Sequence, residues 1–422
     1  MENKQGCSEN QERQAAITGL GIISCLGCSL NEVSASLREG RSGVVFDKER
    51  QKLGFRSALT GCIKSFDTNR YNISQKILRT VCEPALYAYA ASLEAIKDAR
   101  LTADLYTSDR CGIIFGNDSC VKPAVESIDI VHAKGSTHNI GAGHIFRILN
   151  STVTMNLTAA LGICGASWTV SAACASSAHA IGQAMMLIKS GIQDIVIVGG
   201  AQETNWQSMA SFDALGVFST RHDQPEKASR PFDYQRDGLV PSGGAACLIL
   251  EELLHAKARN ARIYGVVSGY GFASNGSNHL FNPSKEGVIK AMRMAIANAN
   301  VDPEQIDYIN AHATSTPVGD RIEAYAIADV FGTSVPVSST KSMTGHECWM
   351  AGASEVLYTT LMARDGFIAP NINFVEHDAD CAAIKVVNKT ILSPIKLAIS
   401  NSFGFGGTNA ALVLDFRLKS NL

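Results

Sequence analysis

The chain has 422 residues, and its 37 lysines and arginines against 39 aspartates and glutamates give a formal net charge of −2. This length indicates two domain-sized units or one large α/β body, and a hydrophobic content of 46% is enough to build a sizeable core. A charge so close to zero gives no reason to expect nucleic acid or a membrane surface as a partner.

The N-terminal segment and the cysteines favour a cytoplasmic enzyme. Residues 1–14 are mostly polar and lack the apolar core of a signal peptide, so we interpret them as a loosely attached tail. The twelve cysteines are scattered, which is typical of free thiols in a reducing compartment. The single C-x-x-C unit, Cys25 to Cys28, has no second half that would complete a zinc site, and we predict no metal.

Apolar runs that favour strands alternate with amphipathic helical stretches, which is typical of a layered α/β fold. In chain order, the sequence predicts a strand over residues 16–18, a helix over 83–99, a strand over 111–115, a helix over 178–189, strands over 194–198, 245–250 and 263–267, a helix over 285–299, a strand over 308–310, helices over 321–331 and 353–363, and strands over 397–400 and 410–414. No linker rich in proline, glycine or serine divides the chain.

A weak internal repeat predicts two related halves. Ile-Thr-Gly-Leu-Gly at 17–21 resembles Val-Ser-Gly-Tyr-Gly at 267–271, and later strands of each half end in clusters of small and polar residues. We place the halves at 15–255 and 256–422, with reactive groups at the C-terminal ends of their strands.

The first G-x-G, Gly19 to Gly21, also resembles the start of a dinucleotide-binding fingerprint. Ser24 stands where that fingerprint needs its third glycine, and Glu39 lies in a polar run rather than at the end of a strand. A tight turn is therefore the preferred interpretation of this element.

Cys174 is the strongest candidate for a nucleophile. A short β-prone stretch over 168–170 leads into small residues around the cysteine, and the predicted helix 178–189 follows directly. The positive end of a helix favours thiolate over thiol, and small neighbours let a substrate carbonyl reach the sulfur.

Two of the ten histidines stand in similar surroundings. His312 follows the predicted strand 308–310 and is flanked by residues typical of turns and caps. His346 lies shortly after Lys341 in Lys-Ser-Met-Thr-Gly-His. The other histidines lie in helices or polar loops, so we expect His312 and His346 to share the site with Cys174.

Four sequence blocks together resemble the β-ketoacyl-acyl carrier protein synthases, the condensing enzymes of dissociated fatty-acid synthesis. The blocks are Ser-Ala-Ala-Cys-Ala-Ser-Ser-Ala-His-Ala-Ile-Gly at 171–182, Ala-His-Ala-Thr-Ser-Thr-Pro-Val-Gly-Asp at 311–320, Thr-Lys-Ser-Met-Thr-Gly-His at 340–346 and Asn-Ser-Phe-Gly-Phe-Gly-Gly-Thr-Asn at 401–409. The likeness runs from about residue 15 to 414 and is closer to synthase I. It implies a thiolase-like fold with five layers, α-β-α-β-α, and a homodimer or a heterodimer with a related chain-length subunit.

The resemblance implies a decarboxylative Claisen condensation. The Cys174 thiolate takes an acyl chain from phosphopantetheine on an acyl carrier protein, so the enzyme itself needs no cofactor. Neutral His312 and His346 then polarise the malonyl thioester oxygen while carbon dioxide leaves. Lys341 and Glu323 resemble the supporting ion pair of the family.

The remaining site residues also come from the resemblance. The backbone N–H groups of Cys174 and Phe405 match the oxyanion donors, and Phe405 matches the gating phenylalanine of the family. Thr314 and Thr316 are similar to the hydroxyls that hydrogen-bond the pantetheine arm. Phe403 and Ser119 complete the set of substrate-binding residues.

Several positions depart from the family pattern. Ala313 replaces a common glycine, and Glu-Cys-Trp-Met at 347–350 replaces small residues. Asp118 and Ser119 are polar where the family's pocket floor is apolar or glycine. Together with the flat ring of Trp349, they lead us to expect that polar, unsaturated or aryl-capped chains are accepted well. The alternative is that Asp118 caps the following segment and points away from the pocket.

Two other classes of protein compete with the condensing enzyme. Non-catalytic chain-length subunits lack the cysteine, whereas Cys174 is present. Thiolases carry a second cysteine as a base in their C-terminal half, whereas the block 401–409 has none and offers Phe405. Primary fatty-acid elongation and a dedicated polyene or polyketide pathway both remain open.

Overall fold

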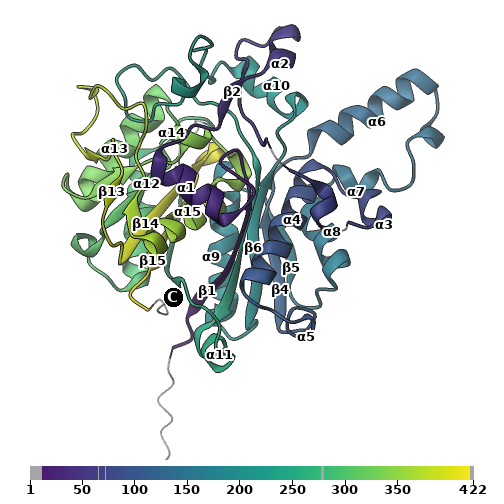
Figure 1. The fold of residues 1–422 in the computed structure, drawn as a ribbon. Helices are drawn as coiled ribbons and strands as arrows, with labels where there is room; N and C mark the ends of the chain where they lie inside the picture. The colour runs from purple at the N-terminus through teal and green to yellow at the C-terminus, as the bar shows by residue number, and fades with distance from the viewer. Residues whose placement is uncertain (1–11, 65, 72, 277–279, 419–422) are drawn as a thin grey trace, which may run out of the picture.

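The computed structural model describes residues 12–64, 66–71, 73–276 and 280–418 (Figure 1). Within these residues, eleven strands form one hydrogen-bonded sheet. In spatial order they are β12 (Lys385–Val386), β10 (Pro336–Ser338), β9 (Tyr308–Asn310), β14 (Leu397–Gly404), β15 (Thr408–Asp415), β8 (Gly265–Ser274), β1 (Ala15–Ile23), β7 (Gly244–Glu252), β6 (Ile195–Gln202), β4 (Cys111–Gly116) and β5 (Ser167–Val170). Every predicted strand is present, and most are longer than predicted.

The sheet consists of two parts that meet at β1 and β8. These strands pair only where Ala15, Ala16 and Ile17 face Val267, Val266 and Gly265. Beyond that short contact, β1 pairs with β7 and β8 pairs with β15. We therefore describe the two parts as two sheets. The first sheet contains β1, β7, β6, β4 and β5, and the second contains β8, β15, β14, β9, β10 and β12.

Helices cover both faces of each sheet. Two lie between the sheets, α9 (Ser176–Lys189) and α15 (Ala351–Asp365). Outside the first sheet are α4 (Glu83–Asp98) and α8 (Thr152–Leu161), and outside the second are α12 (Lys285–Ala299) and α13 (Pro317–Phe331) (Figure 1). This is the expected thiolase-like α-β-α-β-α arrangement. Because both faces are covered, β6 and β7 are buried along their whole length, which explains their continuous apolar sequences.

The buried residues of α9 show why its sequence pattern predicts this position. Ala178, Ile181, Met185 and Ile188 recur at helical spacing, and all four lie in the central hydrophobic cluster between the sheets. α15 is more extreme, because every residue from Ala351 to Ala363 is buried. α15 is thus enclosed by protein over most of its length, whereas α9 leaves Met186 exposed.

The G-x-G elements are not tight turns, and that prediction is wrong. Gly19 and Gly21 lie inside β1, where a Cβ atom would come within 2.4 Å of the Ala95 carbonyl and 2.0 Å of the Ala91 carbonyl of α4. The second copy behaves alike, since a Cβ on Gly269 would lie 2.2 Å from the Ala295 carbonyl of α12. Glycine is needed because a helix backbone packs directly on the strand.

Two regions differ from a simple alternation of strands and helices. Of the predicted tail, residues 1–11 lie outside the described residues, while Arg13 is bound to the body through Asp194 at 2.5 Å and the Ile188 carbonyl at 2.8 Å. The helix α6 (Val121–Lys134) extends away from the body, and the chain returns at α7 (Ile145–Ile148), which packs beside α8; neither helix was predicted (Figure 1). The predicted boundary between the two halves of the chain, after residue 255, stays a prediction.

Among the described residues, no helix combines the length and the apolar character that crossing a membrane requires.

Candidate active site

Cys174 lies in a strained turn between β5 and α9. Ala173 has a φ of 47°, which is unusual for a residue with a side chain. Three hydrogen bonds hold this turn. The Ser176 hydroxyl accepts from the Ala172 N–H at 2.8 Å and donates to the Ala173 carbonyl at 2.6 Å, and Asp118 Oδ2 accepts from the Ala173 N–H at 3.2 Å. The turn fixes the cysteine directly before the N-terminus of α9, as the sequence predicts.

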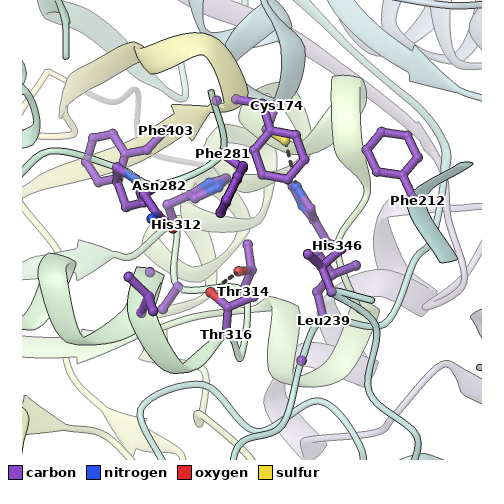
Figure 2. A pocket seen from close by; sticks show the side chains of 18 of the residues that line it. Cys174, Phe212, Leu239, Phe281, Asn282, His312, Thr314, Thr316, His346 and Phe403 are labelled. Carbon is purple, nitrogen blue, oxygen red and sulfur yellow. Dashed lines mark hydrogen bonds between the residues drawn. The ribbon is translucent and has the colours of Figure 1, made fainter. Parts of the chain in front are cut away.

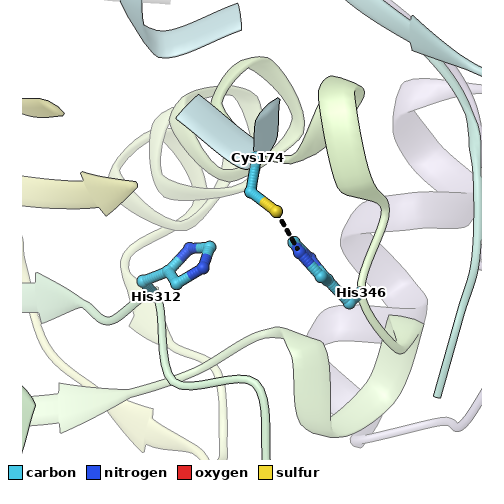
Figure 3. A group of neighbouring side chains, drawn as sticks. All are labelled: Cys174, His312 and His346. Carbon is cyan, nitrogen blue, oxygen red and sulfur yellow. Dashed lines mark hydrogen bonds between the residues drawn. The ribbon is translucent and has the colours of Figure 1, made fainter. Parts of the chain in front are cut away.

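His312 and His346 approach Cys174 from different segments (Figure 3). Nε2 of His346 lies 3.0 Å from the Cys174 sulfur. The two imidazole ring centres are 5.3 Å apart, with their planes at 87°. The expected meeting of these three residues is therefore present in the structure.

Burial keeps both imidazoles neutral. It lowers the pKa of His312 well below its ordinary value, and the positive charge of Lys341 and the neighbouring His346 lower it further. Burial and Lys341 lower the pKa of His346 in the same way. Neutral rings near pH 7 can donate an N–H hydrogen bond without carrying a charge into the site.

The Cys174 thiol is subject to opposing influences. Burial is the largest influence and raises the pKa of this thiol to about 12. The charge of Lys341 and the backbone N–H groups of Phe405 and Cys174 lower the pKa. The nearby carboxylate of Asp118 raises it. The two N–H groups assigned to the oxyanion thus both lower the pKa of this thiol. Their role in catalysis stays a prediction.

The prediction that Lys341 and Glu323 form an ion pair is wrong. Lys341 Nζ pairs directly with Glu355 of α15, and both side chains are almost completely buried. Glu323 instead accepts hydrogen bonds from the backbone N–H groups of His312 at 2.9 Å and Ala313 at 2.6 Å, and from the Asn401 amide at 3.0 Å. Glu323 therefore fixes the backbone that carries His312, and the ammonium group has a different partner.

Glu355 is the site residue that the sequence analysis missed. Burial raises the pKa of its carboxyl, and the Lys341 ammonium opposes that rise. A signal was present, because Glu355 interrupts a run of small and apolar residues in a predicted helix. A charge in such a helix is rarely buried without a partner.

A cavity of about 350 Å³ joins these groups to the substrate-binding candidates (Figure 2). Cys174, His312 and His346 line it, together with Thr314, Thr316, Phe403 and Phe405. The hydroxyl oxygens of Thr314 and Thr316 lie 3.1 Å apart, and the Phe403 ring packs edge-on against His312 with ring centres 5.8 Å apart. The Phe405 ring stacks on Phe212 at 6.2 Å.

Asp118 and Ser119 do not form a polar pocket floor, and neither is among the residues that line this cavity. Asp118 faces the nucleophile turn through Ala173, so it does not cap the following segment either. Ser119 lies behind Trp349 and accepts a hydrogen bond from its indole N–H at 3.3 Å. The expected tolerance for unsaturated or aryl-capped chains now rests on Trp349 alone and stays a prediction.

The sulfur and imidazole nitrogens also resemble a set of metal ligands, because they lie within 4.8 Å of one another. Zinc accepts such ligands at bond lengths of about 2.0–2.3 Å. In this arrangement, however, Nε2 of His346 faces the sulfur at hydrogen-bond distance. The geometry as it stands is that of a thiol beside an imidazole.

Replacing Asp118 with asparagine should shift the titration of Cys174 to lower pH. The carboxylate raises the pKa of the thiol through its charge, whereas its hydrogen bond to Ala173 needs only an acceptor oxygen. Asparagine keeps the acceptor and removes the charge, so more thiolate exists at a given pH. Iodoacetamide alkylation of the Cys174 peptide, followed by mass spectrometry over a pH series, measures the shift.

Asp118→Ala is the matched control, because it removes the charge and the acceptor together. If the alkylation profile of Asp118→Asn stayed in place or moved to higher pH, the charge of Asp118 would not act on the thiol.

The fold and the site together define a thiolase-like protein whose candidate active site holds one buried cysteine and two histidines. The sequence matches the Beta-ketoacyl synthase N-terminal domain over residues 12–256 and the Beta-ketoacyl synthase C-terminal domain over residues 264–375. The chain belongs to the β-ketoacyl synthase family.

Named relatives and solved structures agree with this assignment. The chain is 42% identical to 3-oxoacyl-[acyl-carrier-protein] synthase 1 of Escherichia coli K12 over 406 residues, which are 95% of this chain and 98% of that protein. A β-ketoacyl synthase from Burkholderia phymatum superposes with a TM-score of 0.91 at 33% identity, covering 97% of this chain and 100% of the other. A type II PKS ketosynthase, solved with its acyl-carrier protein and bound to a hexaketide, superposes with a TM-score of 0.86 at 29% identity, covering 96% and 99% of the two chains.

Proposed function

We propose that this protein is a β-ketoacyl-[acyl carrier protein] synthase, which elongates a fatty-acid or polyketide chain by two carbons through decarboxylative Claisen condensation. One observation carries the proposal. A buried thiol and two neutral imidazoles share a cavity that also reaches two threonine hydroxyls. This set supplies a nucleophile, donors for a developing enolate and a polar contact for a pantetheine arm.

The first half-reaction loads the acyl chain onto Cys174. The sulfur attacks the acyl thioester carbon, and the backbone N–H groups of Cys174 and Phe405 stabilise the tetrahedral oxyanion. The carbon–sulfur bond to pantetheine then breaks, so the pantetheine thiol leaves with the proton that the cysteine gives up. Both N–H groups lower the pKa of the Cys174 thiol, which supports them as donors to a negative charge at this place.

The second half-reaction uses the histidines. Malonyl-carrier protein enters, its carboxylate leaves as carbon dioxide, and the electron pair forms an enolate whose oxygen accepts N–H bonds from His312 and His346. The enolate carbon attacks the acyl-cysteine, and the Cys174 sulfur departs. Neutral imidazoles suit this step, because loss of the carboxylate generates the carbanion without a strong base.

The partner in both steps is an acyl carrier protein that carries phosphopantetheine, so the enzyme needs no cofactor of its own. The solved ketosynthase with its acyl-carrier protein supports this partner. Thr314 and Thr316 would hold the arm at the mouth of the cavity, and Phe405 would gate it. A cytoplasmic location, where carrier proteins and reduced cysteines coexist, completes the proposal.

The direct test is reconstitution with acyl-carrier protein and malonyl-carrier protein. We expect one β-ketoacyl product for each carbon dioxide released, measured by mass spectrometry and by trapped carbon dioxide. Transfer to coenzyme A without decarboxylation would favour a thiolase instead.

A homodimer is part of the proposal, because one edge of the sheet is open. β5 is the outermost strand next to β4, and Trp168 on it is 38% exposed. An open strand edge pairs readily with another strand. Apolar side chains are also exposed on α6, on α7 and directly after α7, namely those of Ile128, Ile145, Phe146 and Leu149. A second copy that pairs along β5 would cover both features.

Thr169→Pro should convert the dimer to a monomer. The Ala166 and Val170 carbonyls face β4, so strand alternation turns the N–H of Thr169 to the open edge, and proline removes that donor. Light scattering after size exclusion should show half the wild-type mass, with the circular dichroism spectrum unchanged. Thr169→Ala keeps the N–H and should remain dimeric. A dimeric Thr169→Pro protein would place the interface elsewhere.

A further inference from the structure

Beyond the Cys174 sulfur, the cavity ends on a wall of aromatic and sulfur-containing side chains. One hydrophobic cluster contains the buried residues Cys174, Met209, Phe218, Leu239, Cys348 and Trp349, with Phe212 packed against it. All seven residues line the cavity. Figure 2 shows Phe212 on the side of Cys174 away from Phe403 and His312.

Trp349 is the largest side chain in this wall. Its backbone is held in a short turn, and its indole N–H is held by a hydrogen bond. It lies in a short 3-10 turn, η6 (Cys348–Met350), which begins two residues after His346 at Cys348, whose φ is 46°. The indole N–H donates to the Ser119 hydroxyl at 3.3 Å, and the ring lies 6.2 Å from Phe212. Ser119 follows β4, so this bond ties two segments that are 230 residues apart.

This arrangement leaves the indole little freedom. Trp349 is 5% exposed, so a displaced ring would leave its N–H buried without a partner. The other members of its hydrophobic cluster are buried and Phe212 is partly buried against it, and close-packed interiors do not deform continuously. A group that approaches from the sulfur therefore meets a fixed surface.

An acyl chain on Cys174 must extend toward this wall. The imidazoles and the threonine hydroxyls occupy the polar side of the cavity, where malonyl-pantetheine has to bind. The apolar side offers the cluster around Trp349. With about 350 Å³ in total, the cavity is at the lower end of the roughly 300–1,000 Å³ of small-molecule sites, and it also has to hold the malonyl-pantetheine arm, so only part of this volume is left for the acyl chain.

We propose that Trp349, anchored by Ser119, sets the longest acyl chain that Cys174 accepts. Short chains fit between the sulfur and the indole, and elongation stops when the end of the chain reaches the ring. The inference rests on the proposed condensing function, and it assigns to these two residues a role in choosing the substrate.

The test measures acylation of Cys174 with saturated acyl-carrier proteins of increasing chain length, by intact-protein mass spectrometry. Wild type should lose occupancy sharply above a short limit. Trp349→Ala should extend that limit, and preference should rise by about fourfold for each methylene group that enters the vacated space. Ser119→Ala keeps the ring but removes its anchor, so it should widen the limit by a smaller amount. Phe272→Ala is the matched control, because this aromatic ring on β8 is 44% exposed and lies outside the cavity lining.

Each outcome separates the claims. Identical length profiles for wild type and Trp349→Ala would overturn the inference while leaving the condensing function intact. A shift in Trp349→Ala with none in Ser119→Ala would overturn the anchoring role of Ser119. If Trp349→Ala does not fold, Trp349→Phe shortens the wall by a smaller amount and should still lengthen the accepted chain. Absence of any acylation in wild type would count against the proposed function itself.

Discussion

Replacing Cys174 with alanine abolishes condensation but leaves binding of malonyl-carrier protein intact. The sulfur is the only atom proposed to carry the acyl chain, and without it the enolate has no electrophile. The side chain is small and lines the cavity, so removal of its sulfur changes the packing little. Intact-protein mass spectrometry should show no acyl adduct, and a β-ketoacyl product should be undetectable in the same assay that detects it with wild type.

The histidines provide an internal control for this variant. His312 and His346 remain in place, so some release of carbon dioxide from malonyl-carrier protein should persist. Full condensing activity in Cys174→Ala would mean that another group carries the acyl chain, and the assigned site would be wrong.

Replacing either histidine with alanine should slow decarboxylation by about 10²–10³-fold, the loss of roughly 2.7–4 kcal/mol that is typical for one oxyanion donor. His312 and His346 are both buried and neutral, so each can supply one N–H bond to the enolate oxygen. Acylation of Cys174 should continue in both variants. Single-turnover measurement of carbon dioxide release from malonyl-carrier protein separates this step from loading.

Glutamine is the matched substitution, because its amide keeps an N–H donor without an imidazole. His346→Gln should recover part of the rate that His346→Ala loses. Release of carbon dioxide at the wild-type rate in His346→Ala would show that this ring does not contact the enolate, despite its 3.0 Å approach to the sulfur.

The two predictions depend on different parts of the molecule, although one cavity joins them. Cys174 is held by a local turn, in which Ser176 both accepts and donates a hydrogen bond and Asp118 accepts one from the Ala173 N–H. His312 depends on Glu323, whose carboxylate accepts the backbone N–H of the histidine. A substitution at Glu323 should therefore affect decarboxylation more than loading.

The sequence alone predicted the layered fold and the three residues that meet at the candidate site. The strands and helices are long and strongly periodic, so the burial pattern of α9 could be predicted from Ala178, Ile181, Met185 and Ile188. Cys174 and His312 each follow a predicted β-prone stretch, and His346 follows threonine and glycine. These features depend only on residues that are neighbours in the sequence, and such residues remain neighbours in the folded protein.

Tertiary structure alone decided the partners of buried charges. Sequence spacing cannot show that Lys341 pairs with Glu355 on α15 while Glu323 binds backbone N–H groups. Both carboxylates are buried, and each takes whichever donor the packing brings within reach. Packing also decides why glycine is needed at positions 19 and 269. At each position a helix packs directly on the strand, and the strand by itself would accept a larger residue.

Tertiary structure also decided which polar residues face the substrate. Asp118 and Ser119 follow β4 directly, and nothing in that stretch shows that one carboxylate holds the nucleophile turn while the next hydroxyl holds the indole of Trp349. The two contacts join segments that are 55 and 230 residues apart. Side-chain direction at the end of a strand depends on the surfaces that pack against it, and those surfaces come from the rest of the chain.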